Sequence, residues 1–402
     1  MKKKHLGMEL IATALVLWLC PLSWSQSLPQ SNEGDYVAHD FHFRSGEVLP
    51  ELRLHYYSAG QPVRDAQGHV TNAVMIVHPT ISEGGWHLRY KGFADELFGP
   101  GQLLDANRYY IISPDAIGHG KSSKPSDGLH ARFPHYDYDD MVEAEHLLLT
   151  EHLKVDHLRL FMGESMGCMH AFMFAEKYPD FLDAAMPMGC SVVEIAGRNR
   201  IFRKVLMDAI RNDPGYQNGE YKQQPAALRT ALGLVLVEVT SPIRMQRQYP
   251  TRETADAALK EFVDSRLGDS DANDVLYAWD ASRNYDPSGK LDQIKAAVTW
   301  VNSADDAVNP PELSIAEDQI KKVKHGRFVL LPISDLTPWP RNSFLSDGLE
   351  AIPGRVARTD QAMLRWEQSK ALWREAQALY SNLNIGSGID ESKALIAALS
   401  MS

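Results

Sequence analysis

The feature that most constrains the fold is a serine set between two glycines where a strand meets a helix. Residues 157–164 form a short, mostly apolar run, and residues 166–178 have helical spacing. Gly163 and Gly167 flank Ser165 in the pattern G-x-S-x-G, which predicts a tight turn that exposes the serine at the positive end of the helix. Glycine suits both flanking positions because a Cβ there would clash with neighbouring backbone. We therefore predict that Ser165 is a nucleophile rather than part of an ordinary tight turn.

The pattern around this turn predicts an α/β fold. Two alternating runs, 41–46 and 51–60, are expected to form antiparallel strands, and residues 26–34 are expected to be loose. Continuous apolar runs then alternate with helical stretches, which is typical of a mostly parallel central sheet with helices on both faces. The expected buried strands are residues 74–79, 108–115, 184–189, 296–303 and 326–333.

One long stretch breaks this alternation and divides the chain. Residues 191–290 are helix-rich, polar and charged, with no apolar strand run, so they are expected to form a helical cap over the site. The cap separates a first core part, 26–190, from a second, 291–337. Residues 338–402 form an atypical C-terminus.

The first 25 residues resemble a secretory signal peptide. Lys2, Lys3 and Lys4 form a positive start, Leu10–Leu22 is an apolar stretch too short to span a membrane comfortably, and small residues precede a cleavage site after Ser25. We expect a secreted or periplasmic protein with no membrane span after cleavage. The alternative is an uncleaved anchor.

Charge and composition exclude several classes of function. Hydrophobic residues make up 44% and charged residues 23%, as in globular proteins. The 41 basic and 52 acidic residues give a net charge of −11 without a long basic run, which argues against nucleic-acid binding. No cofactor is expected. No metal is expected either, because the one calcium-like pattern, which begins at Asp269, has Asp274 where a glycine is required.

Two cysteines, Cys168 and Cys190, remain after the signal peptide. They could pair in an oxidising compartment. Because Cys168 lies in the first turn of the helix after Ser165, where helix packs on sheet, we favour a small buried thiol over a disulfide.

Several motifs together resemble the α/β-hydrolases, and within them the group similar to homoserine O-acetyltransferase. The resemblance covers about residues 40–337 and is carried by VMIVHPT, SPDAIGHGKSSKPSDG, FPHYDYDDMV, MGESMGCMHAF, NDPGYQNGEY and VNSADDAVNPPEL. It implies an oxyanion hole formed by the backbone N–H groups of Met166 and Thr80, since Pro79 has no N–H. It also implies that Asp306 is the catalytic acid, with Asp305 as the alternative. His78 is expected to be structural, and a homodimer is one expected assembly.

The expected catalytic histidine is missing. In this fold it follows the last strand, after the acid. Of fifteen histidines only His325 follows Asp306, and it precedes the last predicted strand. Eight strand residues at about 3.3 Å each would place it some 25 Å away, at the wrong end of the sheet. His325 therefore cannot be the base.

The genetic code suggests an explanation for this absence. Pro338–Phe344 can be back-translated so that a shift of one base gives R-G-H-G-T-H-S, and the residues that follow become an amphipathic helix, F-R-T-A-L-K-Q-Y-L-A-E-L-L-E. We therefore hypothesise that a frame change near Thr337 replaced the C-terminus, so that Pro340 overlaps the codon of the lost histidine. The alternative is a divergent C-terminus.

These observations support an enzyme that acts through an acyl-enzyme at Ser165. The expected substrate is a small ester or acyl donor, and the acyl group passes to water or to a hydroxyl acceptor. We favour hydrolysis over acyl transfer, partly because export would separate the protein from cytoplasmic acetyl-CoA. The alternative is a catalytically impaired product of a frame-changed gene, or a non-catalytic binding protein.

Overall fold

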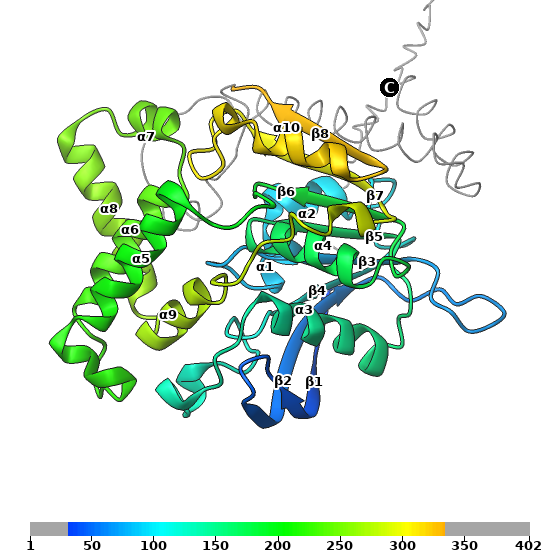
Figure 1. Cartoon of the computed structure of the whole chain (residues 1–402), viewed down its shortest axis with the longest axis horizontal. Coiled ribbons are helices and arrows are strands. Elements are labelled where there is room, and N and C mark those ends of the chain that lie inside the picture. Colours follow the sequence, from blue (N-terminus) through cyan, green and yellow to red (C-terminus); the bar gives the residue numbers. More distant parts are fainter. Residues whose placement is uncertain (1–30, 334–402) are drawn as a thin grey trace, which may run out of the picture.

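An eight-stranded sheet forms the centre of this computed structural model, which describes residues 31–333 (Figure 1). The strand order is β1-β2-β4-β3-β5-β6-β7-β8, in which β3 to β8 run parallel and the first two strands are antiparallel. This confirms the mostly parallel α/β sheet. The strands are β1 (Ser31–His42), β2 (Val48–Ala59), β3 (Ala73–Val77), β4 (Tyr110–Pro114), β5 (Leu160–Glu164), β6 (Ala184–Met188), β7 (Ala297–Ser303) and β8 (Gly326–Leu331).

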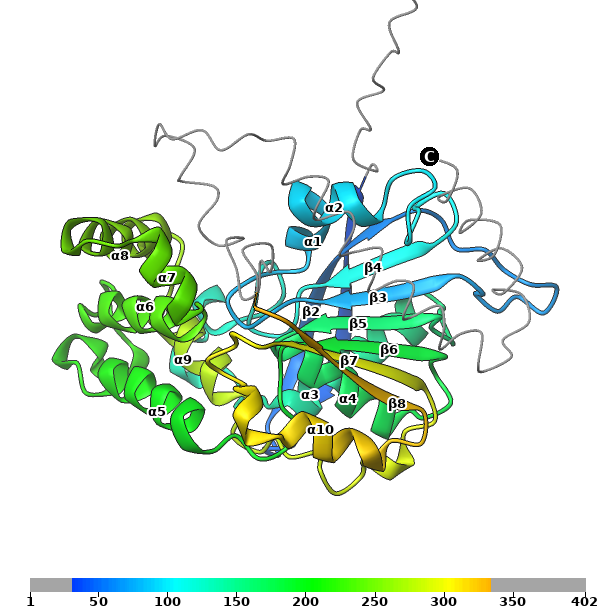
Figure 2. The ribbon, with the colours of Figure 1, turned by 90° about the horizontal axis from the view of Figure 1, so that it is seen from above.

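Helices cover both faces of the sheet (Figure 2). One face packs against α1 (Gly85–Arg89) and α2 (Lys91–Leu97), and the other packs against α3 (Tyr138–Leu147), α4 (Met166–Lys177) and α10 (Ile315–Gln319). A π-helical turn, Leu148–His152, continues α3. Short 3₁₀ turns lie at Pro125–Asp127, His130–Arg132, Pro214–Gly219, Leu291–Gln293, Pro311–Leu313 and Ile320–Lys322.

The central strands form because their side chains are apolar on both faces. Every residue of β3, β4 and β7 is buried, as expected of strands covered by helices on two sides. The edge strand β1 behaves differently and corrects one expectation. Residues 31–34, expected to be loose, are paired with β2, from Ser31 opposite Ala59 onward. An edge strand has a neighbouring strand on only one side and is largely exposed to water. The first residues of β1 are therefore polar, and the sequence did not indicate a strand there.

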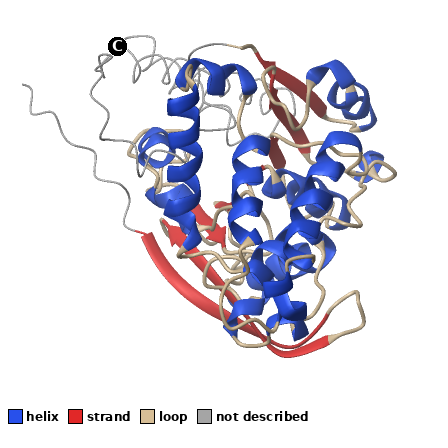
Figure 3. Cartoon of the chain, turned by 90° about the vertical axis from the view of Figure 1, so that its left-hand side faces the viewer, coloured by secondary structure: helices blue, strands red, loops and turns tan. Residues whose placement is uncertain are grey.

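Five helices lie between β6 and β7, to one side of the sheet, and they fill the foreground in Figure 3. They are α5 (Gly197–Arg211), α6 (Ala227–Glu238), α7 (Pro242–Gln248), α8 (Arg252–Leu267) and α9 (Ala272–Asp280). We call them the cap helices. Within residues 31–333, no helix combines the length and the apolar character needed to cross a bilayer.

Candidate active site

Ser165 occupies a strained backbone position between β5 and α4. Its φ is 53° and its ψ is −107°, values that a residue with a Cβ rarely adopts. Two hydrogen bonds hold it there: its N–H donates to the carbonyl of Met188 on β6 (2.9 Å), and its own carbonyl accepts the N–H of Met169 (3.1 Å). Strain of this kind costs about 1–3 kcal/mol and is characteristic of functional sites. The side chain is partly exposed.

The glycines around Ser165 permit close approaches of backbone. A Cβ on Gly163 would lie 2.1 Å from the carbonyl oxygen of Gly167, and a Cβ on Gly167 would lie 2.1 Å from the carbonyl oxygen of Val77. Neither contact is tolerable for a side chain. The two glycines therefore let α4 start directly against β5 and the end of β3, which fixes where the serine emerges.

Two backbone N–H groups near Ser165 are available as donors. Met166 begins α4, and Thr80 lies in the loop after β3, the strand that pairs with β5 up to Gly163. Among residues 31–333, neither the Met166 nor the Thr80 N–H donates to a protein acceptor. Both N–H groups are therefore unpaired within the described part of the chain.

Two buried histidines hold the start of the Thr80 loop. His78 contacts the carbonyl of Pro79 through Nδ1 (2.9 Å), and its Nε2 accepts the N–H of Ala116 (3.1 Å). Burial lowers the pKa of His78 to about 4, so the ring is neutral and this acceptor role is open to it. His119 contacts the Thr80 carbonyl through Nε2 (2.9 Å), and burial lowers its pKa to about 3. These contacts give His78 the structural role expected of it.

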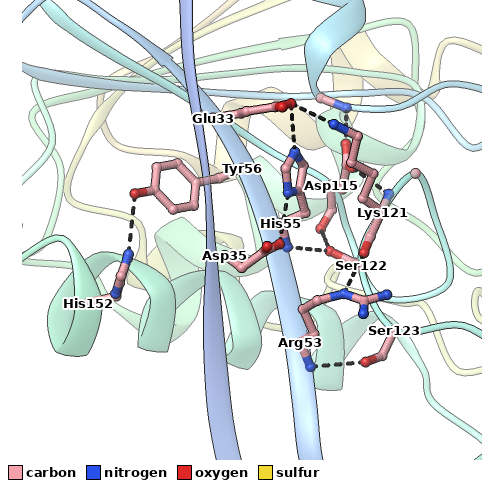
Figure 4. A network of polar contacts seen from close by, with 12 residues as sticks. Glu33, Asp35, Arg53, His55, Tyr56, Asp115, Lys121, Ser122, Ser123 and His152 are labelled. Atoms are coloured by element: carbon pink, nitrogen blue, oxygen red, sulfur yellow. Dashed lines mark hydrogen bonds and ion pairs between the residues drawn. The ribbon is translucent and has the colours of Figure 1, made fainter.

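Asp115 holds the other end of the same loop (Figure 4). One of its oxygens accepts the N–H of Gly84 (2.6 Å), and the other accepts the N–H of Lys121 (2.8 Å). Asp115 is 1% exposed, and burial raises the pKa of its carboxyl group. Figure 4 shows how the network extends to the edge of the sheet, where Lys121 pairs with Glu33 of β1 (2.6 Å). The Thr80 loop is thus fixed at both ends.

Asp306 lies in the turn after β7 and is buried. One oxygen accepts the N–H groups of Val308 (2.8 Å) and Asn309 (3.0 Å), and the other accepts the Asn309 side-chain amide (2.9 Å). Burial raises the pKa of Asp306, and these hydrogen bonds oppose that shift. Asp305, the alternative acid, is instead bound by the hydroxyl of Ser303. Within residues 31–333, every hydrogen bond to the Asp306 carboxylate comes from its own turn.

Strand register brings these groups to one edge of the sheet. The register places Glu164 on β5 beside Met188 on β6, and Met188 beside Val301 on β7. Ser165 and the Asp306 turn therefore follow their strands at the same, carboxyl end of the sheet. Their strands are two spacings of about 4.8 Å apart. His325 lies at the opposite end, where its carbonyl accepts the N–H of Val298. This is the end of the sheet at which the sequence predicted His325.

The chain after β8 starts beside the acid. Leu331 pairs with Ser303, and its carbonyl accepts the N–H of Ala304 (2.8 Å), two residues before Asp306. A residue shortly after Leu331 is therefore suitably placed to reach the acid. Thr337 and Pro340, where the frame change and the lost histidine are hypothesised, lie outside the described residues, as does the signal peptide.

The two cysteines correct a second expectation. Cys168 and Cys190 form a disulfide, with Cα atoms 5.9 Å apart, rather than separate buried thiols. The first turn of α4 packs beside the residues that follow β6, because Ser165 is itself hydrogen-bonded to Met188 at the end of that strand. A sequence separation of 22 residues does not indicate this proximity.

The structure shows an ion pair beside the turn that holds Asp306, and the sequence analysis did not predict it. Arg198, near the start of α5, donates to the carbonyl of Ala307 (3.0 Å) and lies 2.9 Å from a carboxylate oxygen of Glu238. Glu238 ends α6 and is buried, and burial raises its pKa to about 7. Asp306 contributes to this rise, since its charge disfavours a second carboxylate nearby. The only hint in the sequence is a single acid at the end of an apolar helix.

The chain is similar to known proteins with an alpha/beta hydrolase fold. A family model described as the alpha/beta hydrolase fold matches residues 74–331. A probable acyltransferase from Methanothermobacter thermautotrophicus is 28% identical over 280 residues, covering 69% of this chain and 84% of that protein. A homoserine O-acetyltransferase from Geotalea daltonii is 27% identical over 320 residues, covering 71% and 85% respectively. The solved structure of an esterase, E22, has a TM-score of 0.67 at 20% identity and covers 76% of this chain and 94% of that one.

Proposed function

The chain belongs to the alpha/beta hydrolase fold family, in the group similar to homoserine O-acetyltransferases, and we propose that it uses Ser165 to take an acyl group from a small ester or acyl donor. The observation that carries this proposal is the strained backbone of Ser165, held between β6 and α4. A fold gains nothing in stability from such a position, whereas a nucleophile does need to emerge there.

The proposed chemistry runs through a covalent intermediate. The Ser165 oxygen attacks the acyl carbonyl, and the N–H groups of Met166 and Thr80 stabilise the resulting oxyanion. Collapse of this intermediate expels the alcohol or thiol, which takes up the proton released by the serine. Water or a hydroxyl acceptor then attacks the acyl-serine and frees the enzyme.

Asp306 is proposed to orient the base and to stabilise its positive charge. Its carboxylate is buried and fixed by its turn, and β8 delivers the following segment beside it. We place the missing histidine in that segment and keep the frame change near Thr337 as the proposed reason for its absence.

We favour hydrolysis over acyl transfer. The proteins similar to this chain include both acyltransferases and, among solved structures, an esterase, so family membership alone does not decide between the two reactions. The segment VHPTISEGG departs from the glycine-rich loop usual in the acetyltransferases, and Met207 takes the place where an arginine of that group would align. Met207 is buried on α5 and belongs to its packing.

Export of the protein is part of the proposal. The first 25 residues have the three parts of a signal peptide. The disulfide between Cys168 and Cys190 supports the same compartment, because disulfides persist in oxidising surroundings. A secreted or periplasmic enzyme without access to acetyl-CoA would pass its acyl groups to water.

A second candidate is a catalytically impaired chain, or a protein that binds without turnover. One observation favours it: His325, the only histidine after Asp306, lies at the opposite end of the sheet. Without a base, Ser165 retains its position and loses its activation.

A fluorophosphonate probe separates the two candidates, because it labels only an activated serine. The full chain, its Ser165→Ala variant and a frame-restored chain are treated in parallel. Labelling that depends on Ser165 supports an active enzyme. Labelling of the restored chain alone supports the impaired product. No labelling of either chain contradicts the assignment of Ser165.

A further inference from the structure

His78 lies next to the proposed oxyanion donor Thr80 and has no part in the chemistry assigned above. It directly follows β3 and is fully buried. The register places Val77, the last residue of β3, beside Gly163 on β5. The loop that contains Thr80 therefore starts level with the strand end that delivers Ser165.

The hydrogen bonds of the His78 ring determine which nitrogen carries the proton. Its Nε2 lies 3.1 Å from the backbone nitrogen of Ala116, whose N–H can only donate, so Nε2 is the acceptor. Burial lowers the pKa of His78 to about 4, so the ring is neutral at pH 7 and its single proton lies on Nδ1. Nδ1 lies 2.9 Å from the carbonyl oxygen of Pro79 and therefore donates to it.

That carbonyl shares a peptide unit with the proposed oxyanion donor. The C=O of Pro79 and the N–H of Thr80 belong to one planar trans peptide, in which the two bonds point in opposite directions. A ring that holds the carbonyl on one side therefore fixes the direction of the N–H on the other. A hydrogen bond to a carbonyl also polarises its amide, which strengthens the N–H as a donor.

The surroundings of this peptide oppose its rotation. The ring of Pro79 locks the φ of that residue at about −65°, which removes one of the backbone rotations beside the peptide. Thr80 is 8% exposed, and its N–H has no protein acceptor within residues 31–333. An N–H in a buried residue that was free to turn would be expected to find an acceptor, so the direction of this one is enforced.

His119, which contacts the next carbonyl, does not offer the same control. Both of its ring nitrogens face carbonyl oxygens, Nδ1 that of Ile117 (3.0 Å) and Nε2 that of Thr80 (2.9 Å). Burial lowers its pKa to about 3, and a neutral ring carries one proton, so it donates to only one of the two. Of these two histidines, only His78 has partners that require a single tautomer.

We propose that His78 is a positioning residue for the oxyanion: it donates through Nδ1 to the Pro79 carbonyl and so directs and polarises the N–H of Thr80. The link runs from the N–H of Ala116 through the neutral ring to the peptide that carries the donor. This inference rests on the proposed function of Ser165 and gives a role to a residue outside the proposed triad.

The tautomer of His78 can be measured without any activity. Long-range proton–nitrogen correlation spectra of the full chain, labelled at its histidine nitrogens, distinguish an Nδ1–H ring from an Nε2–H ring. Loss of the signal in His78→Gln assigns it. We expect a neutral Nδ1–H ring at pH 7. An Nε2–H ring or a charged ring would overturn the proposal, because neither can both donate to Pro79 and accept from Ala116.

Two amide variants separate positioning from support of the fold. The side-chain nitrogen in His78→Asn can take the place of Nδ1 and donate to Pro79. The side-chain oxygen in His78→Gln can take the place of Nε2 and accept from Ala116, but this longer amide does not donate to Pro79. We expect the rate constant for fluorophosphonate labelling of Ser165 to stay within about threefold of the parent in His78→Asn and to fall about tenfold or more in His78→Gln. A purely structural role would instead lower both rates alike, in step with the melting temperatures.

Labelling is measured on the chain as written and, if that chain is not labelled, on the frame-restored chain. Equal labelling rates in the two folded variants would refute the positioning role. If a variant fails to fold, the tautomer of the parent decides. Labelling of neither parent chain would contradict the proposed function, while the tautomer would still show whether His78 holds the Pro79 carbonyl. The two failures are therefore distinguishable.

Discussion

The carbonyl of Leu331 accepts the N–H of Ala304 across 2.8 Å, so the last described strand ends level with the turn that holds Asp306. This contact decides how the absence of a C-terminal histidine is interpreted. Whatever follows Leu331 starts beside the acid, and a base needs only a short loop to reach it. Under the mechanism proposed above, the base would belong to the segment that follows β8.

Replacement of Ser165 by alanine should abolish acyl chemistry and leave the protein folded. The side chain is partly exposed and supports no packing, and its loss removes the covalent route. Ester hydrolysis and thermal melting measure the two effects. Ser165→Gly should be equally inactive but more stable, by about 1 kcal/mol, because glycine tolerates a positive φ. Activity within about tenfold of the parent in either variant would refute the nucleophile.

Asp306→Asn should have little effect on the rate of the chain as written, because no histidine is present for the carboxylate to orient. In a frame-restored chain the same change should reduce kcat by about 10⁴, as in intact triads. Hydrolysis of a short-chain ester by all four proteins gives the comparison. A large loss in the chain as written would reveal a base that has been overlooked.

Restoration of the frame after Thr337 should recover activity and stability together. The change replaces Pro338 onward with RGHGTHSFRTALKQYLAELLE. Ester hydrolysis or acyl transfer should rise by about 10³ or more because a triad member returns. The melting temperature should rise as well, because the new helix carries an apolar face that can cover the sheet beside its edge strand β8.

A restored chain in which the new histidine is replaced by alanine is the control, and it should keep the stability and lose the activity. Ordinary enzymatic turnover by the 402-residue chain as written would instead show that the frame-change hypothesis is wrong.

Glu238 should make stability depend on pH. Burial raises its pKa from 4.5 to about 7, so the folded chain holds this proton more tightly than the unfolded chain. Its contribution to stability is therefore present below pH 4.5 and falls as the pH rises toward 7. Glu238→Gln should remove this dependence. The difference in free energy of unfolding between the variant and the parent should therefore change by about 2 kcal/mol between pH 4.5 and pH 7. Denaturant unfolding at several pH values measures it, with exposed Glu312→Gln as the control.

The disulfide between Cys168 and Cys190 should contribute to stability. It closes a loop of 22 residues, for which chain entropy suggests about 3 kcal/mol. Reduction should lower the free energy of unfolding by about this amount. The double variant Cys168→Ala, Cys190→Ala should show no response to reductant. A parent equally stable with and without reductant would contradict the prediction.

The sequence predicted features that depend on local pattern. The Ser165 turn was recognisable because its glycines are required by close backbone contacts, one within a few residues and one with a neighbouring strand. The buried strands were recognisable because both of their faces are apolar. Features that depend on distant packing were not: nothing near Cys168 marks Cys190 as its neighbour, and nothing near Arg198 marks Glu238. Ser31 and its polar neighbours were missed because an edge strand exposes much of its length.

The strain at Ser165 has a consequence for the history of the gene. The contacts that enforce it lie between residues 77 and 190, well before the position at which we propose a frame change. A lineage that had ceased to use this serine would gain stability from a change of Ser165 to glycine. The serine in the present sequence therefore indicates either that the position is still under selection or that selection on it ended only recently. Counts of silent and amino-acid-changing differences among close relatives, taken at codon 165 and after codon 337, would test whether a frame change occurred and how recently.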